Sequence, residues 1–429
     1  MTLNRTIPPS IRPLGNFDLT RPERRRMKNG IPLNIIRAGS QEVVRFDVLI
    51  GAGQWHQTQS LQALFANRML REGTISMTSA QIAEKLDYYG AWLELSSSPN
   101  CGFITLYSLN KYFPHTMAII ADMLMNPSYP EKELEVVLES NRQQFLVNSQ
   151  RVEVISRKQF NRSLFGEDHP FGRFAVEEDY GRITPEALRE FYRKHYHSGN
   201  CSVYVSGKVT PEIVRCIERN LGDEPWGIIG KVAPLEYFEP KQTSEKRVFV
   251  EKSEALQSSL KMGCFVMDRL HSDFLKTRAM VTLFGGYFGS RLMSNIREDK
   301  GYTYGIGAGV VNCPGSGVLA ITTEADNQYI DAIIGEVYYE IDRLQNDLAP
   351  NDEVEMVRSY MLGDFCRAYE GPFSLSEAWI YTETAGLDDG FFERQIDSIR
   401  SVTSEEIRTL AQRYLCKEKL IEVVAGKKV

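Results

Sequence analysis

The chain repeats itself, and this internal duplication constrains its fold more than any other feature of the sequence. The segments ITPEALREFYRKHYHSGNCSVYVSG (183–207) and VTSEEIRTLAQRYLCKEKLIEVVAG (402–426) align without a gap. Each begins with a Thr that can cap a helix, continues as an amphipathic helix, and ends in an apolar strand that stops at a Gly. Two matched segments far apart in one chain predict two homologous halves.

Looser matches extend the duplication towards the start of each half. One pair predicts a strand that enters a helical stretch, a second a helix with a Gly turn and a strand, and a third a helix after a strand. These pairs are 42–53 with 258–267, 83–97 with 293–309, and 112–127 with 328–344. Gly, Pro and charged residues without periodicity mark the joint. We therefore predict an N-terminal domain over 1–228, a linker over 229–246 and a C-terminal domain over 247–429.

The local patterns within each half mix strands with helices. Asn29-Gly30, in RMKNGIPLNIIRAG, is a strong hairpin signal and favours antiparallel pairing. Such a half buries its apolar surface best when the helices pack against a sheet. The predicted fold class is α+β: two homologous domains, each a mostly antiparallel sheet with helices packed on one face.

Charge and cysteine usage narrow the classes of partner. The net charge of −6 gives no support to a nucleic-acid partner. The seven cysteines are scattered without a Cys-x-x-Cys pair, which favours reduced thiols over a disulfide framework.

No apolar signal-peptide core is visible near the start, and no run of 18 apolar residues predicts a membrane span. The expected location is cytoplasmic.

The stretch LQALFANRMLREGT (61–74) has the form of a helix that ends in a Gly-Thr turn. Leu64, Asn67 and Arg68 fall on one face of it, because positions i, i+3 and i+4 are neighbours on a helix. In one zinc-peptidase pattern this face carries His, Glu and His, where the histidines bind metal and the Glu activates water. Leu cannot bind zinc, Asn is a poor ligand and Arg repels a cation.

Five segments in the same order resemble the pitrilysin or insulinase family of zinc metallopeptidases, whose zinc motif is inverted relative to most zincins. They are RMKNGIPLNIIRAG, NPSYPEKELEVVLES (126–140), FGEDHPFGR (165–173), ITPEALREFYRKHY and LFGGYFGSRLMSNIREDKGYTYGIGAG (283–309). The resemblance covers nearly the whole chain. It implies that the two halves together form half of a clamshell that encloses a chamber.

The resemblance assigns the zinc motif residue by residue. The His-x-x-Glu-His of the family falls on Leu64, Asn67 and Arg68, and its distal glutamate falls on Ser140, or on Glu139 if that helix slips by one. Catalytic zinc needs three protein ligands, so this chain is expected to bind none. The histidines are interpreted as scattered surface or turn residues: His56, His115, His169, His195, His197 and His271.

The second half keeps a pair of residues that the family uses. REDKGYTY places Arg297 and Tyr304 on either side of the Gly301 turn. In active members the corresponding Arg and Tyr reach towards the zinc site, where they are thought to hold substrate backbone and stabilise the oxyanion. Both side chains suit that chemistry as donors. Tyr302, on the other face of the strand, is expected to have a packing role.

The resemblance therefore implies the non-zinc subunit of a heteromeric zinc metallopeptidase. Its partners would be a homologous zinc-bearing subunit and an unfolded peptide, and zinc, the one cofactor implied, would sit on the partner chain. Arg297 and Tyr304 would complete the active site of that partner, so this chain alone is not expected to be an active peptidase. The alternative is a catalytically inert scaffold or peptide-binding homologue, including a homodimer.

Overall fold

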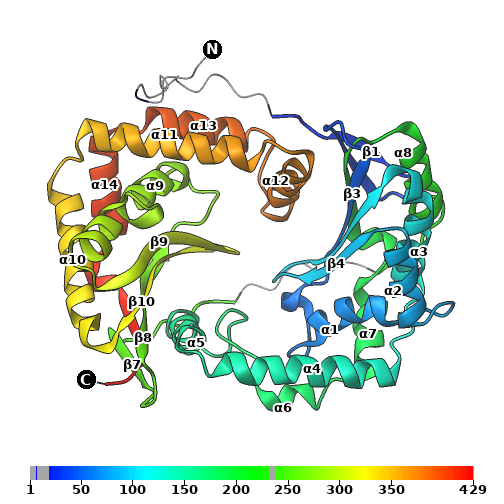
Figure 1. Cartoon of the computed structure of the whole chain (residues 1–429), viewed down its shortest axis with the longest axis horizontal. Coiled ribbons are helices and arrows are strands. Elements are labelled where there is room, and N and C mark those ends of the chain that lie inside the picture. The colour runs from blue at the N-terminus through cyan, green and yellow to red at the C-terminus, as the bar shows by residue number, and fades with distance from the viewer. Residues whose placement is uncertain (1–5, 7–18, 231–237, 429) are drawn as a thin grey trace.

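The computed structural model describes residues 6, 19–230 and 238–428. Figure 1 shows two β-sheets that stand on opposite sides of the molecule, with helices wrapped around both. The strands of the first sheet, in spatial order, are β1 (Glu23–Arg26), β2 (Pro32–Arg37), β6 (Cys201–Gly207), β3 (Val43–Ile50), β5 (Gly102–Leu109) and β4 (Trp92–Ser97). Those of the second are β7 (Arg247–Glu251), β11 (Ile421–Gly426), β8 (Gln257–Val266), β10 (Ser316–Asp326) and β9 (Thr303–Cys313).

The helices divide in the same way. The first half contains α1 (Gln62–Arg68), α2 (Ser79–Tyr88), α3 (Phe113–Met125), α4 (Glu131–Ser149), α5 (Val152–Phe165), α6 (Glu177–Tyr180), α7 (Pro185–His195) and α8 (Pro211–Ile217). The second contains α9 (Phe274–Val281), α10 (Ile330–Asn346), α11 (Asn351–Ala368), α12 (Pro372–Thr384), α13 (Phe391–Ser401) and α14 (Ser404–Tyr414). None of the helices in the described ranges is long and apolar enough to cross a membrane.

The predicted duplication is confirmed by strand order and by register. The order β2-β6-β3-β5-β4 recurs as β7-β11-β8-β10-β9, and β1 is an addition at one edge. In both sheets one pair is parallel, β2 with β6 and β7 with β11, and the other pairs are antiparallel. The sheets are therefore mostly antiparallel, as predicted. The fold class α+β is confirmed.

The local signals of the repeated segment act as expected in both copies. The hydroxyl of Thr184 accepts from the backbone N–H of Ala187 at the start of α7, and that of Thr403 accepts from Glu406 at the start of α14. A side-chain oxygen at this position pairs one of the N–H groups that a helix start leaves without a partner. The predicted hairpin also forms, because Gly30 (φ +92°) makes the turn between β1 and β2.

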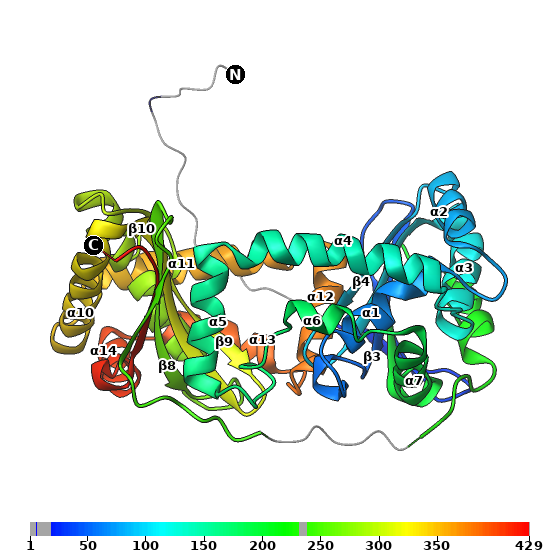
Figure 2. The same ribbon diagram turned by 90° about the horizontal axis from the view of Figure 1, so that it is seen from below.

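The helices do not stay with their own half. Each half sends one helix across, so that α5 packs on β8 and β11 of the second sheet and α12 packs on β6 and β2 of the first. Figure 2 shows α4 running across the molecule to α5, which stands against the second sheet. The two exchanged helices occupy the same place in the order of elements of their halves. A sheet face that the prediction left bare is thus covered by the other half.

Buried side chains follow this exchange. Two large clusters each lie between one sheet and its own helices. A third cluster joins Ile36, Leu49 and Tyr204 of the first sheet to Trp379 of α12, and a fourth joins Phe160 of α5 to the second sheet. Apolar burial therefore ties the halves together. The boundaries at 228 and 247 stay a prediction, and the predicted linker is only partly visible, because residues 231–237 lie outside the described residues, as do 1–5 and 7–18 of the start.

Candidate functional site

Asn67, at the position of the expected catalytic base, is turned into the protein. Its side chain is buried, and its amide nitrogen donates to the backbone oxygen atoms of Ser96 at 2.5 Å and Phe103 at 3.1 Å. Ser96 and Phe103 face each other in the register of β4 and β5. Asn67 therefore fastens α1 to this pair of strands. Its nitrogen is occupied as a donor, and a carboxamide is too weak a base to take a proton from water at neutral pH.

The flanking positions do not converge with Asn67. Leu64 is half-buried and lines a pocket with Ser60 and Arg173, whereas Arg68 is exposed and lines a different hollow with Arg71 and Val137. The sequence predicts that these three side chains share one face of the helix, but the packing of α1 turns them towards different neighbours. The side chains at 64, 67 and 68 consequently have three different environments.

The remaining expected position lies on the exposed side of α4. Ser140 is exposed, and so is Glu139, whose carboxylate accepts from Arg142 at 3.0 Å and from Gln143 at 2.7 Å. The hydrogen bond from Arg142 lowers the pKa of Glu139. These residues do not fit a zinc ion, because Leu offers no donor, Asn67 faces the sheet and Arg68 is a cation. Among the described residues no group of three or more His, Cys, Asp and Glu side chains could hold a metal ion.

The histidines agree only in part with the surface or turn interpretation, because His115 and His271 are exposed and His169 lies in the turn after α5, but three of the six side chains are buried. His169, His195 and His197 are buried, and the rings of His56 and His195 lie 5.3 Å apart. His195 ends α7 and His197 lies beyond it. Burial lowers the pKa of His195 to about 4, and the neighbouring His56 adds to the effect. These side chains are neutral packing residues at neutral pH.

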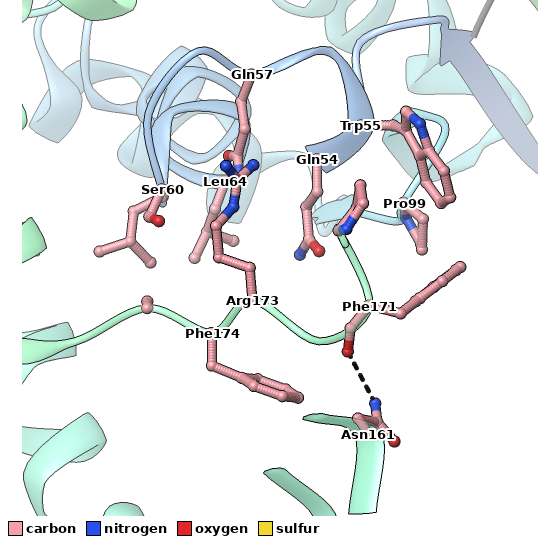
Figure 3. Close-up of a pocket in the computed structure, with 13 residues that line it drawn as sticks. Gln54, Trp55, Gln57, Ser60, Leu64, Pro99, Asn161, Phe171, Arg173 and Phe174 are labelled. Atoms are coloured by element: carbon pink, nitrogen blue, oxygen red, sulfur yellow. Dashed lines mark hydrogen bonds between the residues drawn. The ribbon is translucent and has the colours of Figure 1, made fainter. Parts of the chain in front are cut away.

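A pocket of about 220 Å³ opens beside Leu64. Figure 3 shows it between the segment before α1 and the loop that follows α5. Its polar side chains are Gln54, Gln57, Ser60, Asn161 and Arg173, and the remaining lining is apolar or aromatic: Trp55, Leu61, Leu64, Pro99, Pro170, Phe171, Phe174 and Ala175. Arg173 ends the segment 165–173, one of the five that resemble the family, but the resemblance assigns it no role.

Arg297 and Tyr304 lie together at the surface of the second half. The guanidinium carbon of Arg297 is 5.2 Å from the centre of the Tyr304 ring and 4.6 Å from that of Phe288. Both aromatic side chains are exposed, Tyr304 to 90% and Phe288 to 60%. The cation is thus within cation–π distance of two rings. In the described part of the chain Arg297 has no carboxylate partner.

The local backbone explains why the pair meets. Arg297 belongs to a π-helical segment (Met293–Asp299), and Gly301 (φ +66°) reverses the chain while its N–H donates to the Arg297 carbonyl at 3.1 Å. A residue with a side chain adopts this positive φ at a cost. The hydroxyl of Thr303 then donates to the backbone oxygen of Glu324 at 2.7 Å and fixes the start of β9. Tyr302 stacks on Tyr329 at 4.8 Å, which agrees with its expected packing role.

The two candidate regions stay apart within this chain. No contact between the described side chains joins Arg297 or Tyr304 to Leu64, Asn67 or Arg68. Phe288 was not predicted from the sequence; it lies in the Gly-rich segment LFGGYFGSR, and its ring contacts the guanidinium of Arg297. The sequence around an aromatic residue in a Gly-rich segment does not indicate which charged side chain it will contact. That contact depends on how the segment folds back on β9.

A duplicated chain with exchanged helices, whose expected zinc-ligand positions hold other residues, has the features of a relative of the two-domain metallopeptidases. Family models agree: one described as "Insulinase (Peptidase family M16)" matches residues 35–167, and one described as "Peptidase M16 inactive domain" matches residues 182–361. The chain belongs to peptidase family M16.

Known proteins support the same family. A Bacillus subtilis protein named "Uncharacterized zinc protease YmxG" is 20% identical over 93% of this chain and 97% of its own length. A Helicobacter pylori protein named "Non-peptidase homolog YmxG" is 24% identical over 57% of this chain and 56% of its own length. A crystal structure from Pseudomonas fluorescens, of a peptidase M16 inactive domain, has the same fold: its TM-score is 0.83 at 19% identity, over 95% of this chain and 98% of that one.

Proposed function

We propose that this chain is the non-zinc subunit of a heteromeric M16 peptidase and that it supplies Arg297 and Tyr304 to the active site of a homologous zinc-bearing partner. The observation that carries the proposal is the contact of Arg297 with the exposed rings of Phe288 and Tyr304. Among the described residues the guanidinium makes no ion pair and no side-chain hydrogen bond, so its N–H donors can bind a further group. Here the cation and the Tyr304 hydroxyl are presented outwards, where a second chain can meet them.

The chemistry of the pair suits a site that it completes in trans. A tetrahedral intermediate of peptide hydrolysis develops negative charge on one oxygen, and preorganised donors stabilise that charge. Arg297 offers a permanent cation with several N–H donors, and Tyr304 offers one hydroxyl donor. The partner would supply the metal and the base, since Leu64, Asn67 and Arg68 of this chain fit neither role.

Edge strands would hold an extended peptide. Within the described ranges β4 pairs with β5 alone and β9 with β10 alone, so each leaves one row of backbone groups unpaired by another described strand. Figure 1 shows both strands reaching towards the middle of the molecule. An unfolded peptide can add to such an edge through main-chain hydrogen bonds. This mode of binding selects for extended conformation rather than for one sequence.

Reconstitution tests the proposal. A homologue with an intact His-x-x-Glu-His is produced with this chain, and peptide hydrolysis is measured for each chain alone and for the complex. Tyr304→Phe removes one hydroxyl and keeps the ring, so turnover should fall by roughly 10²-fold or more. Arg297→Lys should also impair turnover, because an ammonium cannot reproduce the guanidinium geometry. Tyr302→Phe is the matched control, since Tyr302 stacks on Tyr329 and should leave turnover unchanged.

A catalytically inert scaffold or peptide-binding subunit is the second candidate. The buried Asn67 favours it, because the residue at the expected position of the catalytic base instead binds the backbone of β4 and β5. The name "Non-peptidase homolog" of the Helicobacter pylori relative also fits this function. Full peptidase activity in a complex that carries both Tyr304→Phe and Arg297→Lys would decide for the scaffold. A stable homodimer that binds peptide and ignores every zinc-bearing homologue would do the same.

A reducing compartment suits the thiols of the chain. All seven cysteines are free, and Cys216, Cys264 and Cys313 are buried. Burial raises the pKa of Cys264 to about 12 and that of Cys313 to about 11, which suppresses the reactive thiolate. We propose a cytoplasmic location on this basis. Fractionation of cells that produce the chain at its natural level would test it.

A further inference from the structure

The pocket beside Leu64 carries one positive charge and no negative one. Its lining contains neither Asp nor Glu, and Arg173 is its sole charged residue. In the described part of the chain Arg173 makes no ion pair and no side-chain hydrogen bond. The side chain is exposed, so solutes can reach it. An Arg without a carboxylate partner, placed at the wall of a pocket, is a binding group for an anion.

The amide of Gln57 adds a donor on the same side. Its oxygen accepts from the backbone N–H of Ala63 at 3.3 Å, which fixes the orientation of the amide and leaves the NH₂ group free to donate. Figure 3 shows the side chain of Arg173 extending towards Gln57 and Leu64. Leu64, which replaces a zinc ligand, supplies an apolar wall next to these two donors. A carboxylate placed here would meet both donors beside a surface that excludes water.

The loop that carries Arg173 is held in place by aromatic and polar contacts. The ring of Trp55 lies 5.1 Å from that of Phe171, and the amide of Asn161 donates to the Phe171 backbone oxygen at 3.2 Å. The backbone N–H of Phe171 donates in turn to the imidazole of His169 at 3.1 Å. Because these contacts fix the loop before any ligand arrives, binding need not order it. The pocket is preorganised.

We propose that this pocket binds a carboxylate of an extended peptide, with Arg173 and the Gln57 amide as the donors. The inference rests on the peptide-binding part of the proposed function and names the chemical group that the chain recognises. The volume of about 220 Å³ is below the roughly 300–1,000 Å³ of pockets that enclose whole small ligands, so it suits one end or one side chain of a peptide. The carboxylate can come from the peptide C-terminus or from an Asp or Glu side chain.

Calorimetric titration of the full chain tests the inference. Three N-acetylated peptides of about nine neutral residues are compared: one with a free C-terminal carboxylate, the same peptide amidated, and the amidated peptide with one Gln changed to Glu. A carboxylate bound by a charged donor should strengthen binding by about tenfold over the amidated neutral peptide. The preference should weaken between about 50 mM and 500 mM salt, because Arg173 is exposed.

Two variants test whether the preference for a carboxylate peptide arises in this pocket. Arg173→Gln should abolish the preference. Arg193→Gln removes an exposed Arg on α7 outside this pocket and should leave the preference unchanged. Thermal unfolding of both variants checks that the fold is retained. If the free-carboxylate peptide alone shows the preference, the terminus is the ligand; if the Glu peptide shows it, the side chain is.

Equal binding of all three peptides would overturn the inference and leave peptide binding intact. Absence of binding by all three would overturn it as well, and the trans-acting role of Arg297 and Tyr304 would still be decided separately by the reconstituted activity. A carboxylate preference that survives Arg173→Gln would place the anion site elsewhere.

Discussion

Replacing Asn67 tests whether the former base position is now structural. Asn67→Ala removes the two hydrogen bonds that the amide donates to the Ser96 and Phe103 carbonyls. A hydrogen bond contributes about 0.5–1.5 kcal/mol net, so the free energy of unfolding should fall by roughly 1–3 kcal/mol. That is a measurable part of the roughly 5–15 kcal/mol that stabilises a typical folded protein. Arg68→Ala, one residue further along and exposed, should change the free energy of unfolding by no more than about 0.5 kcal/mol.

Asn67→Asp adds a pH dependence whose sign follows from burial. A carboxylate at this position would face two carbonyl oxygens in a buried site, so the folded-state pKa should rise above the unfolded value of about 3.9. Between these two pKa values the folded chain binds more protons than the unfolded chain, and stability falls as pH rises. The variant should therefore be less stable at about pH 8 than at about pH 5, relative to the unsubstituted chain.

Urea unfolding followed by intrinsic fluorescence measures both effects. Hydrogen exchange adds a local readout, because the amides of β4 and β5 should lose protection first in Asn67→Ala. The reasoning would be refuted if Asn67→Ala were as stable as Arg68→Ala, or if Asn67→Asp showed the same stability difference at both pH values. Either result would mean that the buried amide does not hold α1 to the sheet.

Three further predictions concern metal, assembly of the halves and acid stability. Elemental analysis of the purified chain should find no stoichiometric zinc, because the ligand positions hold unsuitable groups; one chelator-removable zinc per chain would contradict this. Trp379→Ala in the exchanged helix α12 should lower stability by about 3–5 kcal/mol and speed proteolysis in both halves, since Trp379 is buried against the first sheet; cleavage confined to one half would count against a shared core. His195→Phe should reduce acid destabilisation: the pKa of His195 is lowered from 6.5 to about 4, so the unfolded chain binds the extra proton and stability is lost as pH falls through this window. Unchanged acid sensitivity in urea unfolding would show that His195 is not its source.

The sequence by itself determined the features that form within a few residues of the chain or that occur in both halves. The caps at Thr184 and Thr403, the helices α7 and α14, and the strands β6 and β11 lie where the aligned segments predict them. Capping and apolar periodicity act over a few residues, so two copies of one pattern fold into two copies of one element. The Gly301 turn that brings Arg297 and Tyr304 together belongs to the same class, because their seven-residue separation keeps the contact local.

Tertiary structure alone decided which surfaces meet. An amphipathic helix shows which of its faces is apolar but not which sheet will cover that face, so the exchange of α5 and α12 left no mark in the periodicity. The same holds for Asn67, which lies in a helix as predicted, while its amide reaches carbonyls 29 and 36 residues away. The contact of Phe288 with Arg297 and the position of Arg173 in the pocket beside Leu64 also depend on tertiary packing. Contacts between distant segments depend on the packing of the whole chain, because many pairings satisfy the same local pattern and only the complete core selects one.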